Sequence, residues 1–255
     1  MFISVFIITK NEQDRIASAI NSVKKIADEI LVIDSGSSDK TVEIASNCGA
    51  KVIYNQWQGY GAQKICGEKL CKNKWILNID ADEEISEKLA LEIGELFSQN
   101  KIDLYSAYKI KIVNKFFGEK KPKKFAYYYN QIRLYNSEKA GFKDSPIYDS
   151  VELKNPNYKI GQLKNITSHQ SFRSFNHWIE KINFYSQMQA QDNFSQGKKP
   201  SKIKILLTPF LAFLKAYFLR RYFIYGFDGI IYSYIFAFGR FIKLVKIRNL
   251  YKNYN

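Results

Sequence analysis

The sequence predicts an α/β protein whose mostly parallel sheet is flanked by helices and followed by a C-terminal helical extension. Over the first hundred residues, short apolar runs rich in β-branched side chains alternate with segments of helical periodicity. This alternation is typical of right-handed crossovers between parallel strands. Beyond residue 170 the apolar residues recur with helical spacing instead, and aromatic and basic residues crowd together.

The individual elements follow from the same periodicities. Continuous apolar runs predict buried strands at 2–9, 29–34, 51–54 and 75–80. Helices are expected from about Asn11, a candidate N-cap, and over 38–49, 60–70 and 86–97. Short strands and turns are expected over 101–165, and a long helix over 172–196.

Polar clusters follow three of the expected strands. They are Thr9–Glu12, Asp34–Asp39 and Asp80–Glu83. Ligands of parallel sheets bind beyond the carboxyl ends of the strands. These three clusters are therefore the candidate binding loops.

The charge of the 255-residue chain is uneven: it is −4 over 1–100, +8 over 101–197 and +11 over 198–255, for a total of +15. An acidic first part and a strongly basic, aromatic second part indicate two different tasks. The three cysteines form neither a disulfide framework nor a four-ligand zinc pattern, so we expect reduced thiols. Because the first apolar run is too short for a signal peptide, we expect a cytoplasmic protein.

Asp80-Ala81-Asp82 directly follows a buried strand and is the strongest chemical signal in the sequence. Residues two apart on an extended segment face the same side, about 6.6 Å apart. We therefore expect a division of labour, with Asp82 on a divalent cation and Asp80 on a ribose hydroxyl or a nearby water. A hard cation with few protein ligands completes its shell with phosphate oxygens of a substrate. The alternative is a solvated acidic turn that caps the next helix.

Asp34 ends the second expected strand, and Gly36 lets the backbone approach a ligand closely. A carboxylate in this place can accept a hydrogen bond from a base N–H or a ribose hydroxyl, and the alternative is a turn with a helix cap. The sequence contains no Gly-x-Gly-x-x-Gly after the first strand and no Gly-x-x-x-x-Gly-Lys. A dinucleotide-binding fold and a P-loop enzyme are therefore disfavoured.

Three ordered motifs carry a resemblance to a known family: Thr9-Lys10-Asn11-Glu12, Ile33-Asp34-Ser35-Gly36-Ser37-Ser38-Asp39-Lys40-Thr41 and Asn78-Ile79-Asp80-Ala81-Asp82-Glu83. In these motifs the chain resembles the family 2 glycosyltransferases, whose fold is the GT-A nucleotide-diphospho-sugar transferase architecture. It is most similar to the bacterial lipopolysaccharide inner-core glucosyltransferases of the WaaE/KdtX type. The likeness is strong over about 1–100 and weaker through Arg133-Leu134-Tyr135, His169 and the aromatic last third.

The resemblance implies a nucleotide-sugar donor, a divalent cation (Mg²⁺ or Mn²⁺) and roles for particular residues. The nucleoside pocket would be lined by Thr9, Asn11, Glu12 and Asp34. Lys64 would reach the uracil or the diphosphate, and Asp80 the ribose. Asp82 would bind the metal, with His169 as a candidate further ligand; the alternative for a lone histidine is a structural role.

The family also implies an inverting reaction that needs a carboxylate base. In the subgroup the base lies in a Val-His-Glu-like segment, which here reads Pro146-Ile147-Tyr148-Asp149-Ser150. Asp149 is therefore the expected base. Glu152 is kept as a substitute, because Tyr replaces His and Asp is one methylene shorter than Glu. The alternative is a loop carboxylate without a chemical role.

The stretches 203–219 and 222–244 are apolar and aromatic but interrupted by Lys and Arg. The longest part without a basic residue contains Asp228 and three glycines, which disfavours a membrane-spanning helix. We expect these stretches to lie in the interface of an anionic membrane, with Lys and Arg reaching the headgroups. The alternative is a pair of core helices that packs on the catalytic domain.

These observations predict a catalytic domain over 1–170, with a nucleotide-binding half at 1–100 and an acceptor-side half at 101–170, and a membrane-associating extension over 171–255. The expected reaction is inverting transfer of a hexose, glucose from UDP-glucose, to a lipid-linked saccharide such as a lipopolysaccharide core. We expect a peripheral enzyme on the inner face of the plasma membrane, with no nucleic-acid partner. The alternatives are a haloacid-dehalogenase-like phosphatase that uses Asp80 and Asp82, and a non-enzymatic basic protein that binds membranes or nucleic acids.

Overall fold

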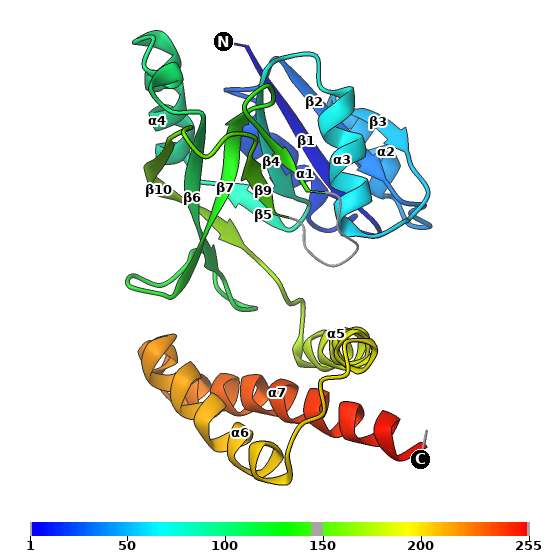
Figure 1. The fold of residues 1–255 in the computed structure, drawn as a ribbon. Helices are drawn as coiled ribbons and strands as arrows, with labels where there is room; N and C mark the ends of the chain where they lie inside the picture. The colour runs from blue at the N-terminus through cyan, green and yellow to red at the C-terminus, as the bar shows by residue number, and fades with distance from the viewer. Residues whose placement is uncertain (1, 144–149, 254–255) are drawn as a thin grey trace. The chain divides into compact units, whose positions relative to one another are not determined.

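The computed structural model of the protein describes residues 2–143 and 150–253. The chain forms two compact units (Figure 1). The sheet unit comprises residues 1–113 and 128–170, and the helical unit comprises 114–127 and 171–255. Residues 114–127 thus belong to the helical unit, although they fall within the range expected for the catalytic domain.

The sheet unit contains ten strands and four α-helices in its described part. The strands are β1 (Ile3–Thr9), β2 (Glu29–Asp34), β3 (Lys51–Tyr54), β4 (Trp75–Asp80), β5 (Glu83–Ile85), β6 (Ala107–Asn114), β7 (Tyr128–Asn136), β8 (Ala140–Phe142), β9 (Val151–Leu153) and β10 (Ile160–His169). The helices are α1 (Ile16–Val23), α2 (Thr41–Asn47), α3 (Tyr60–Leu70) and α4 (Glu87–Ser98). A 3₁₀ turn follows α4 at Ile102–Leu104.

The main sheet has the strand order β3-β2-β1-β4-β7-β6-β10-β5, and β8 and β9 form a separate two-stranded sheet. The pairs β3–β2, β2–β1 and β1–β4 are parallel. From β4 onward the pairs β4–β7, β7–β6 and β10–β5 are antiparallel. The predicted α/β class with helix-flanked parallel strands is confirmed, and of the strands after residue 101 β6, β7 and β10 extend the same sheet.

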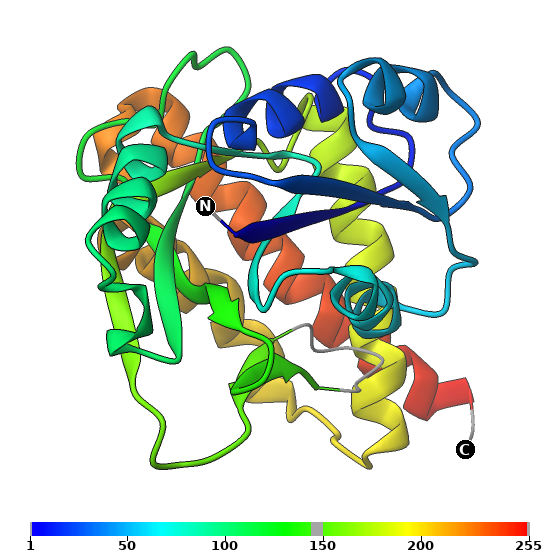
Figure 2. The ribbon, with the colours of Figure 1, turned by 90° about the horizontal axis from the view of Figure 1, so that it is seen from above.

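Strand β1 lies at the centre of the parallel part, and all seven of its residues are buried. Its side chains alternate between two apolar cores, as the pleat requires. Val5 and Ile7 join a core with α1 and α4, whereas Phe6 and Ile8 join a core on the side of α3. Figure 2 shows α1 and α2 on one face of these strands and α3 on the other.

Helix α3 packs closely on β1 because residue 67 is glycine. A Cβ atom at Gly67 would lie 2.5 Å from the ring of Phe6. Real Cβ atoms do not approach carbon this closely, so only glycine lets α3 sit at this depth. This close packing positions the preceding turn of α3, which carries Lys64, against the sheet.

Two expected elements differ in detail. The first helix begins at Ile16 and not at Asn11, because Asn11 has a positive φ of 55° and stands in a loop. The long helix begins at Phe175, where the Ser174 side chain accepts a hydrogen bond from the His177 amide as its N-cap. Strand β5 was not predicted, because three residues beside an acidic turn give too little periodicity.

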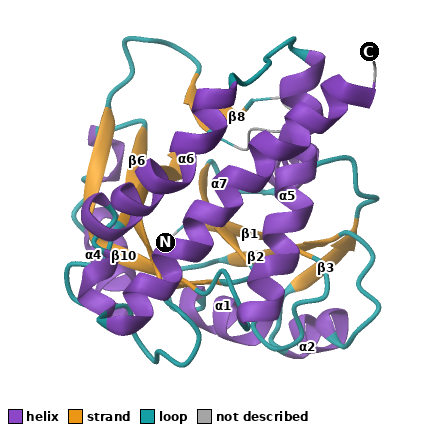
Figure 3. Ribbon diagram, turned by 90° about the horizontal axis from the view of Figure 1, so that it is seen from below, coloured by secondary structure: helices purple, strands orange, loops and turns teal. Residues whose placement is uncertain are grey.

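The helical unit contains α5 (Phe175–Ser195), α6 (Lys202–Leu214) and α7 (Phe227–Asn253), with a π-helical segment at Lys215–Leu219 and a 3₁₀ turn at Tyr222–Tyr225. Helix α7 lies between α5 and α6 (Figure 3). Among the described helices, none is both long enough and apolar enough to cross a bilayer.

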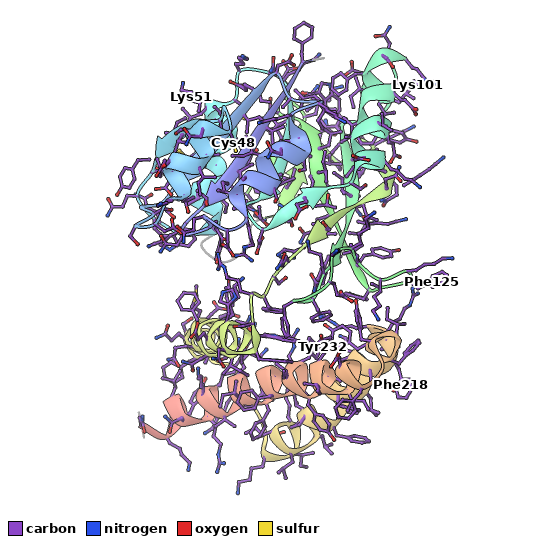
Figure 4. The ribbon with its side chains drawn as sticks, turned by 180° about the vertical axis from the view of Figure 1, so that it is seen from behind. Cys48, Lys51, Lys101, Phe125, Phe218 and Tyr232 are labelled. Carbon is purple, nitrogen blue, oxygen red and sulfur yellow. The ribbon has the colours of Figure 1, made fainter. Side chains whose placement is uncertain are left out.

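An aromatic cluster forms the core of the helical unit. The rings of Phe116 and Tyr232 stack with centroids 4.0 Å apart (Tyr232 is labelled in Figure 4). Trp178, Tyr222 and Tyr225 surround Phe116 with centroids 5.0–5.6 Å away. Phe116 is 2% exposed. Residues 114–127 therefore belong to the helical unit because their aromatic side chain fills its core.

Candidate functional site

Asp80 is the last residue of β4 and lies between two cations. The Lys64 Nζ atom is 3.0 Å from its Oδ1 atom, and the Arg133 Nη2 atom is 3.0 Å from its Oδ2 atom. Lys64 is 1% exposed and also faces the ring of Phe142, 5.6 Å from the centroid. Burial alone would raise the pKa of Asp80, but Lys64 and Arg133 outweigh it and hold the pKa well below its usual range. Asp80 is thus a fixed carboxylate.

A β-bulge directs Arg133 toward Asp80. Tyr108 of β6 pairs with Leu134 of β7, but the next residue, Lys109, pairs with Ile132, so β7 has one extra residue at Arg133. Bulges redirect side chains in this way. Arg133 is 6% exposed, and the Nη atoms of its guanidinium donate to Asn78, Asp80 and Glu83.

Glu83 is the second carboxylate that Arg133 holds. Its Oε1 atom accepts from Arg133 at 2.7 Å, and its Oε2 atom accepts from the Asp80 amide at 3.1 Å. Burial raises the pKa of Glu83, although Arg133 opposes the shift. No individual role was predicted for Glu83 or Arg133, although both stand in stretches that carry the family resemblance. The sequence signal that could have identified Arg133 is an arginine inside an otherwise apolar strand pattern.

Asp82 lies in the turn between β4 and β5, and His169, the last residue of β10, contacts it. Strand β5 pairs with β10 antiparallel, and His169 stands opposite Glu83. The His169 Nε2 atom is consequently 3.2 Å from the Asp82 Oδ1 atom, and the Gln170 amide donates to the Asp82 carbonyl. Burial would lower the pKa of His169, but the Asp82 carboxylate raises it overall. Two candidate metal ligands that are 87 positions apart in the sequence are thus in contact.

Arg15 contacts Glu12, Asp82 and Gln170. No role was predicted for it from the sequence. It is 6% exposed. Its guanidinium contacts the Glu12 carboxylate through two nitrogen atoms, and its Nη1 atom donates to the Gln170 carbonyl at 2.6 Å. The same Nη1 atom is 3.7 Å from the Asp82 Oδ2 atom. Arg15 therefore links the loop after β1, the Asp82 turn and the end of β10.

Asp34 organises the loop that follows β2. Its Oδ2 atom accepts from the amides of Gly36 and Ser37, and its Oδ1 atom accepts from the Ser37 hydroxyl. Gly36 has a φ of +91°, which glycine adopts without strain. Asp34 is 4% exposed. Its carboxylate thus shapes the loop, and one remaining lone pair on Oδ1 is what it can offer to a ligand.

The loop after β1 packs against the loop after β2. The Asn11 amide donates to Ser37 Oγ, and its side-chain Oδ1 atom accepts from the Ser38 amide. The Glu12 amide donates to Thr41 Oγ1 at 2.7 Å. Thr9 differs from these residues, because its Oγ1 atom is buried and has no hydrogen-bond partner within the described part of the chain. A buried hydroxyl of this kind can serve a bound molecule.

Asp82 and His169 fit a divalent cation that carries few protein ligands. Carboxylate oxygen and imidazole nitrogen are both ligands of Mn²⁺ and related ions. In residues 2–143 and 150–253, no group of three or more His, Cys, Asp and Glu side chains is arranged to hold a metal. The pair could therefore serve a cation whose shell is completed by water and substrate oxygens, as hard cations with few protein ligands require.

Of the two candidate bases, the structure describes Glu152. Asp149 lies outside the described residues. Glu152 is in β9, where its side chain is 56% exposed and 3.5 Å from the Lys143 Nζ atom. A cavity of about 210 Å³ lies beside this strand, and its lining includes Lys109, Arg133 and Val151.

The family model of the family 2 glycosyltransferases matches residues 4–150. The chain belongs to this family. The fold is therefore of the GT-A class, and the protein is an enzyme of the glycosyltransferase type. This membership and the position of Asp80-Ala81-Asp82 after the fourth strand both disfavour the phosphatase alternative, and the membership disfavours a non-enzymatic binding protein.

Relatives match along nearly the whole chain. A protein of Rickettsia bellii described as an uncharacterized glycosyltransferase is 49% identical, over 97% of this chain and 86% of its own length. The lipopolysaccharide core biosynthesis glycosyltransferase LpsC of Rhizobium meliloti is 27% identical, over 96% of this chain and 91% of its own length. The solved structure of glucosyl-3-phosphoglycerate synthase from Mycobacterium tuberculosis overlaps 46% of this chain and 44% of its own, at 22% identity and a TM-score of 0.35.

Proposed function

We propose that this enzyme transfers a hexose, glucose from UDP-glucose, with inversion onto a lipid-linked saccharide such as a lipopolysaccharide core. Family membership supports nucleotide-sugar transfer. The description of the Rhizobium relative supports the class of acceptor. The resemblance of the sequence to inner-core glucosyltransferases supports glucose as the sugar.

The observation that carries the proposal is the 3.2 Å contact between Asp82 and His169, beside the cation-held Asp80. Asp82 and His169 would hold Mg²⁺ or Mn²⁺. Such an ion screens the diphosphate and stabilises it as a leaving group. The unpartnered Thr9 hydroxyl, Asp34 and the loop of Asn11 and Glu12 would line the nucleoside pocket. Lys64 and Asp80 would form the wall beside the ribose.

In the proposed reaction, the acceptor hydroxyl oxygen attacks the anomeric carbon of the donor sugar. The bond from that carbon to the diphosphate oxygen breaks, and its electron pair leaves with the nucleoside diphosphate. A carboxylate takes the hydroxyl proton, and Asp149 and Glu152 are the candidate bases. The cavity beside Arg133 and Val151 offers space for part of the acceptor.

A lipid-linked acceptor places the enzyme at a membrane surface. We propose a peripheral location on the inner face of the plasma membrane, with anionic lipid as the partner and no role for nucleic acid. The +11 charge of residues 198–255 supports this location, because each basic residue near an anionic surface contributes about 1 kcal/mol.

Donor hydrolysis and thermal shift with UDP-, GDP- and dTDP-sugars, each with and without Mn²⁺ or Mg²⁺, test the proposal. We expect the response to be largest for UDP-glucose with metal. Asp82→Asn should reduce turnover about 100- to 1,000-fold, because transition-state charge loses its stabilisation. Asp103→Asn, a change of an exposed carboxylate, is the matched control. If wild type and Asp82→Asn respond alike to every donor, the proposed function is wrong.

A further inference from the structure

Helix α6 exposes a row of large apolar side chains. Its members, called the α6 row below, are Ile203, Leu206, Leu207, Phe210 and Leu211, with exposed fractions of 70%, 76%, 52%, 63% and 58%. Their spacing of three and four residues places them on one face of the helix. The opposite face carries Ile205 and Ala212, which are buried. The α6 row is therefore an apolar stripe that faces away from the core of the helical unit.

The apolar surface continues beyond α6. Phe218 and Leu219, in the π-helical segment, are 58% and 71% exposed (Phe218 is labelled in Figure 4). Single exposed leucines are ordinary on protein surfaces, but a contiguous apolar stripe indicates a binding surface.

Basic side chains flank the α6 row. Lys202, Lys204 and Lys215 are exposed and lie at the two edges of the stripe, about 100° or more from its centre. The sequence from 198 to 255 contains twelve Lys and Arg but a single acidic residue, Asp228. Burial lowers the pKa of Lys243 on α7, and the neighbouring cations Arg240 and Lys204 add to the shift. Positive charge therefore accumulates beside the apolar stripe.

We propose that the α6 row inserts into the surface of an anionic lipid bilayer, with the flanking lysines at the headgroups. An apolar stripe with lysine edges is the composition of a helix that lies in a membrane interface. The lysine stems can lie along the apolar surface while their ammonium groups reach the phosphates. This inference rests on the membrane location proposed above and deepens it by naming the face that binds.

Two other binding partners fit the α6 row less well than an anionic bilayer does. A second copy of the chain would bring two strongly positive surfaces together, and like charges oppose such an interface. A nucleic acid would neutralise the lysines but would leave the leucines in water. Only an anionic bilayer satisfies both the charge and the apolar area.

Co-sedimentation of the full chain with vesicles tests the inference. Wild type should bind vesicles of phosphatidylcholine mixed with phosphatidylglycerol, and bind pure phosphatidylcholine more weakly. Leu206→Ser combined with Phe210→Ser should lower the partition coefficient about 100-fold, because two large apolar groups no longer enter the bilayer. Leu91→Ser on α4 is the matched control, since Leu91 is 67% exposed in the sheet unit, and it should bind as wild type does.

A second arm tests the charges. Lys202→Gln combined with Lys204→Gln should lower binding to the mixed vesicles about tenfold, with Lys88→Gln on α4 as control. Donor hydrolysis in solution is measured for every variant and should stay unchanged, so a failed vesicle test does not count against sugar transfer. Unchanged vesicle binding by the Leu206/Phe210 variant would overturn the inference. Lipid-free self-association of wild type that this variant abolishes would overturn it too, in favour of a second copy.

Discussion

The sheet unit contains 20 Lys and Arg and 20 Asp and Glu, whereas the helical unit contains 19 and 4. The whole net charge of +15 thus falls on the helical unit. In the sheet unit, buried charges face opposite charges, as Arg133 faces Asp80 and Glu83. In the helical unit, some cations lie over aromatic rings, as Arg220 does over Phe236 at 4.3 Å, and others donate to neutral oxygens, as Lys246 does to Asn183. Charge in the sheet unit builds an internal site, whereas the excess positive charge of the helical unit is the basis of the proposed binding to anionic lipid.

Among substitutions that should affect one unit and not the other, the largest effect is expected at Arg133. Arg133→Met leaves Asp80 and Glu83 with less positive charge, and we expect the free energy of unfolding of the sheet unit to fall by about 3–5 kcal/mol. Arg133→Lys should restore only part of it, because an ammonium group cannot reproduce the guanidinium fork. Hydrogen exchange read by mass spectrometry should show faster exchange in β4 and β7 and no change in α7. Lys109→Met is the control, and equal acceleration in both units would contradict the prediction.

A substitution at Phe116 tests the independence of the two units from within the helical unit. Phe116→Ala removes the ring that stacks on Tyr232, and a large-to-small change at a buried aromatic residue costs about 3–5 kcal/mol. We expect faster hydrogen exchange in α5 and α7, although Phe116 lies between two strands of the sheet unit in the sequence. Phe125→Ala, at a side chain that is 68% exposed, should have little effect. Faster exchange confined to β6 and β7 would show that this segment belongs to the sheet unit.

A substitution at Arg15 should have a smaller effect on the sheet unit than one at Arg133, and the effect should appear in metal binding. Arg15→Lys weakens the link between Glu12, the Asp82 turn and Gln170, and changes behind a metal ligand lower metal affinity about 10- to 100-fold. Under the proposed function, the Mn²⁺ concentration for half-maximal donor hydrolysis should rise by that factor, while saturating Mn²⁺ restores much of the turnover. Lys24→Gln is the control. A loss of turnover that Mn²⁺ does not relieve would contradict the positioning role of Arg15.

The smallest effect concerns the thiols, all three of which lie in the sheet unit. Burial, with the nearby carboxylates of Glu29 and Glu68, raises the pKa of Cys71 to about 12. Because the thiolate is the reactive form, Cys71 stays protonated at neutral pH and should react slowly with iodoacetamide. Its labelling rate should still be rising at about pH 10, where an ordinary exposed thiol has levelled off, as mass spectrometry of labelled peptides can show. A rate that levels off near pH 9 would contradict this.

Local patterns predicted the parallel part of the sheet well. Strands β2, β3 and β4 and helix α3 have the predicted bounds. Continuous β-branched runs and helical spacing are patterns of residues that are close together in the sequence, so they can be recognised without knowledge of the fold. The family assignment succeeded for a related reason, since each of its three motifs is a short contiguous stretch at the carboxyl end of one parallel strand. The α/β class and the glycosyltransferase assignment are confirmed.

The site's internal contacts could not be predicted from local patterns. Arg133 reaches Asn78, Asp80 and Glu83 across 50–55 positions of sequence, and Arg15 reaches Gln170 across 155. Those contacts depend on the strand order and on a one-residue bulge, which periodicity does not reveal. The roles of Asp34, Lys64, Asp82, His169 and the two candidate bases stay predictions.

The bulge in β7 also constrains which sequence changes this strand can tolerate. One added residue shifts the inside–outside alternation, so the residues before Arg133 are out of phase with those after it. Deleting a single residue between 128 and 132 would either remove the bulge that directs the Arg133 guanidinium or, with the bulge kept, turn the upstream side chains to the opposite face. Substitutions along this stretch should therefore be accepted far more readily in evolution than a change of its length.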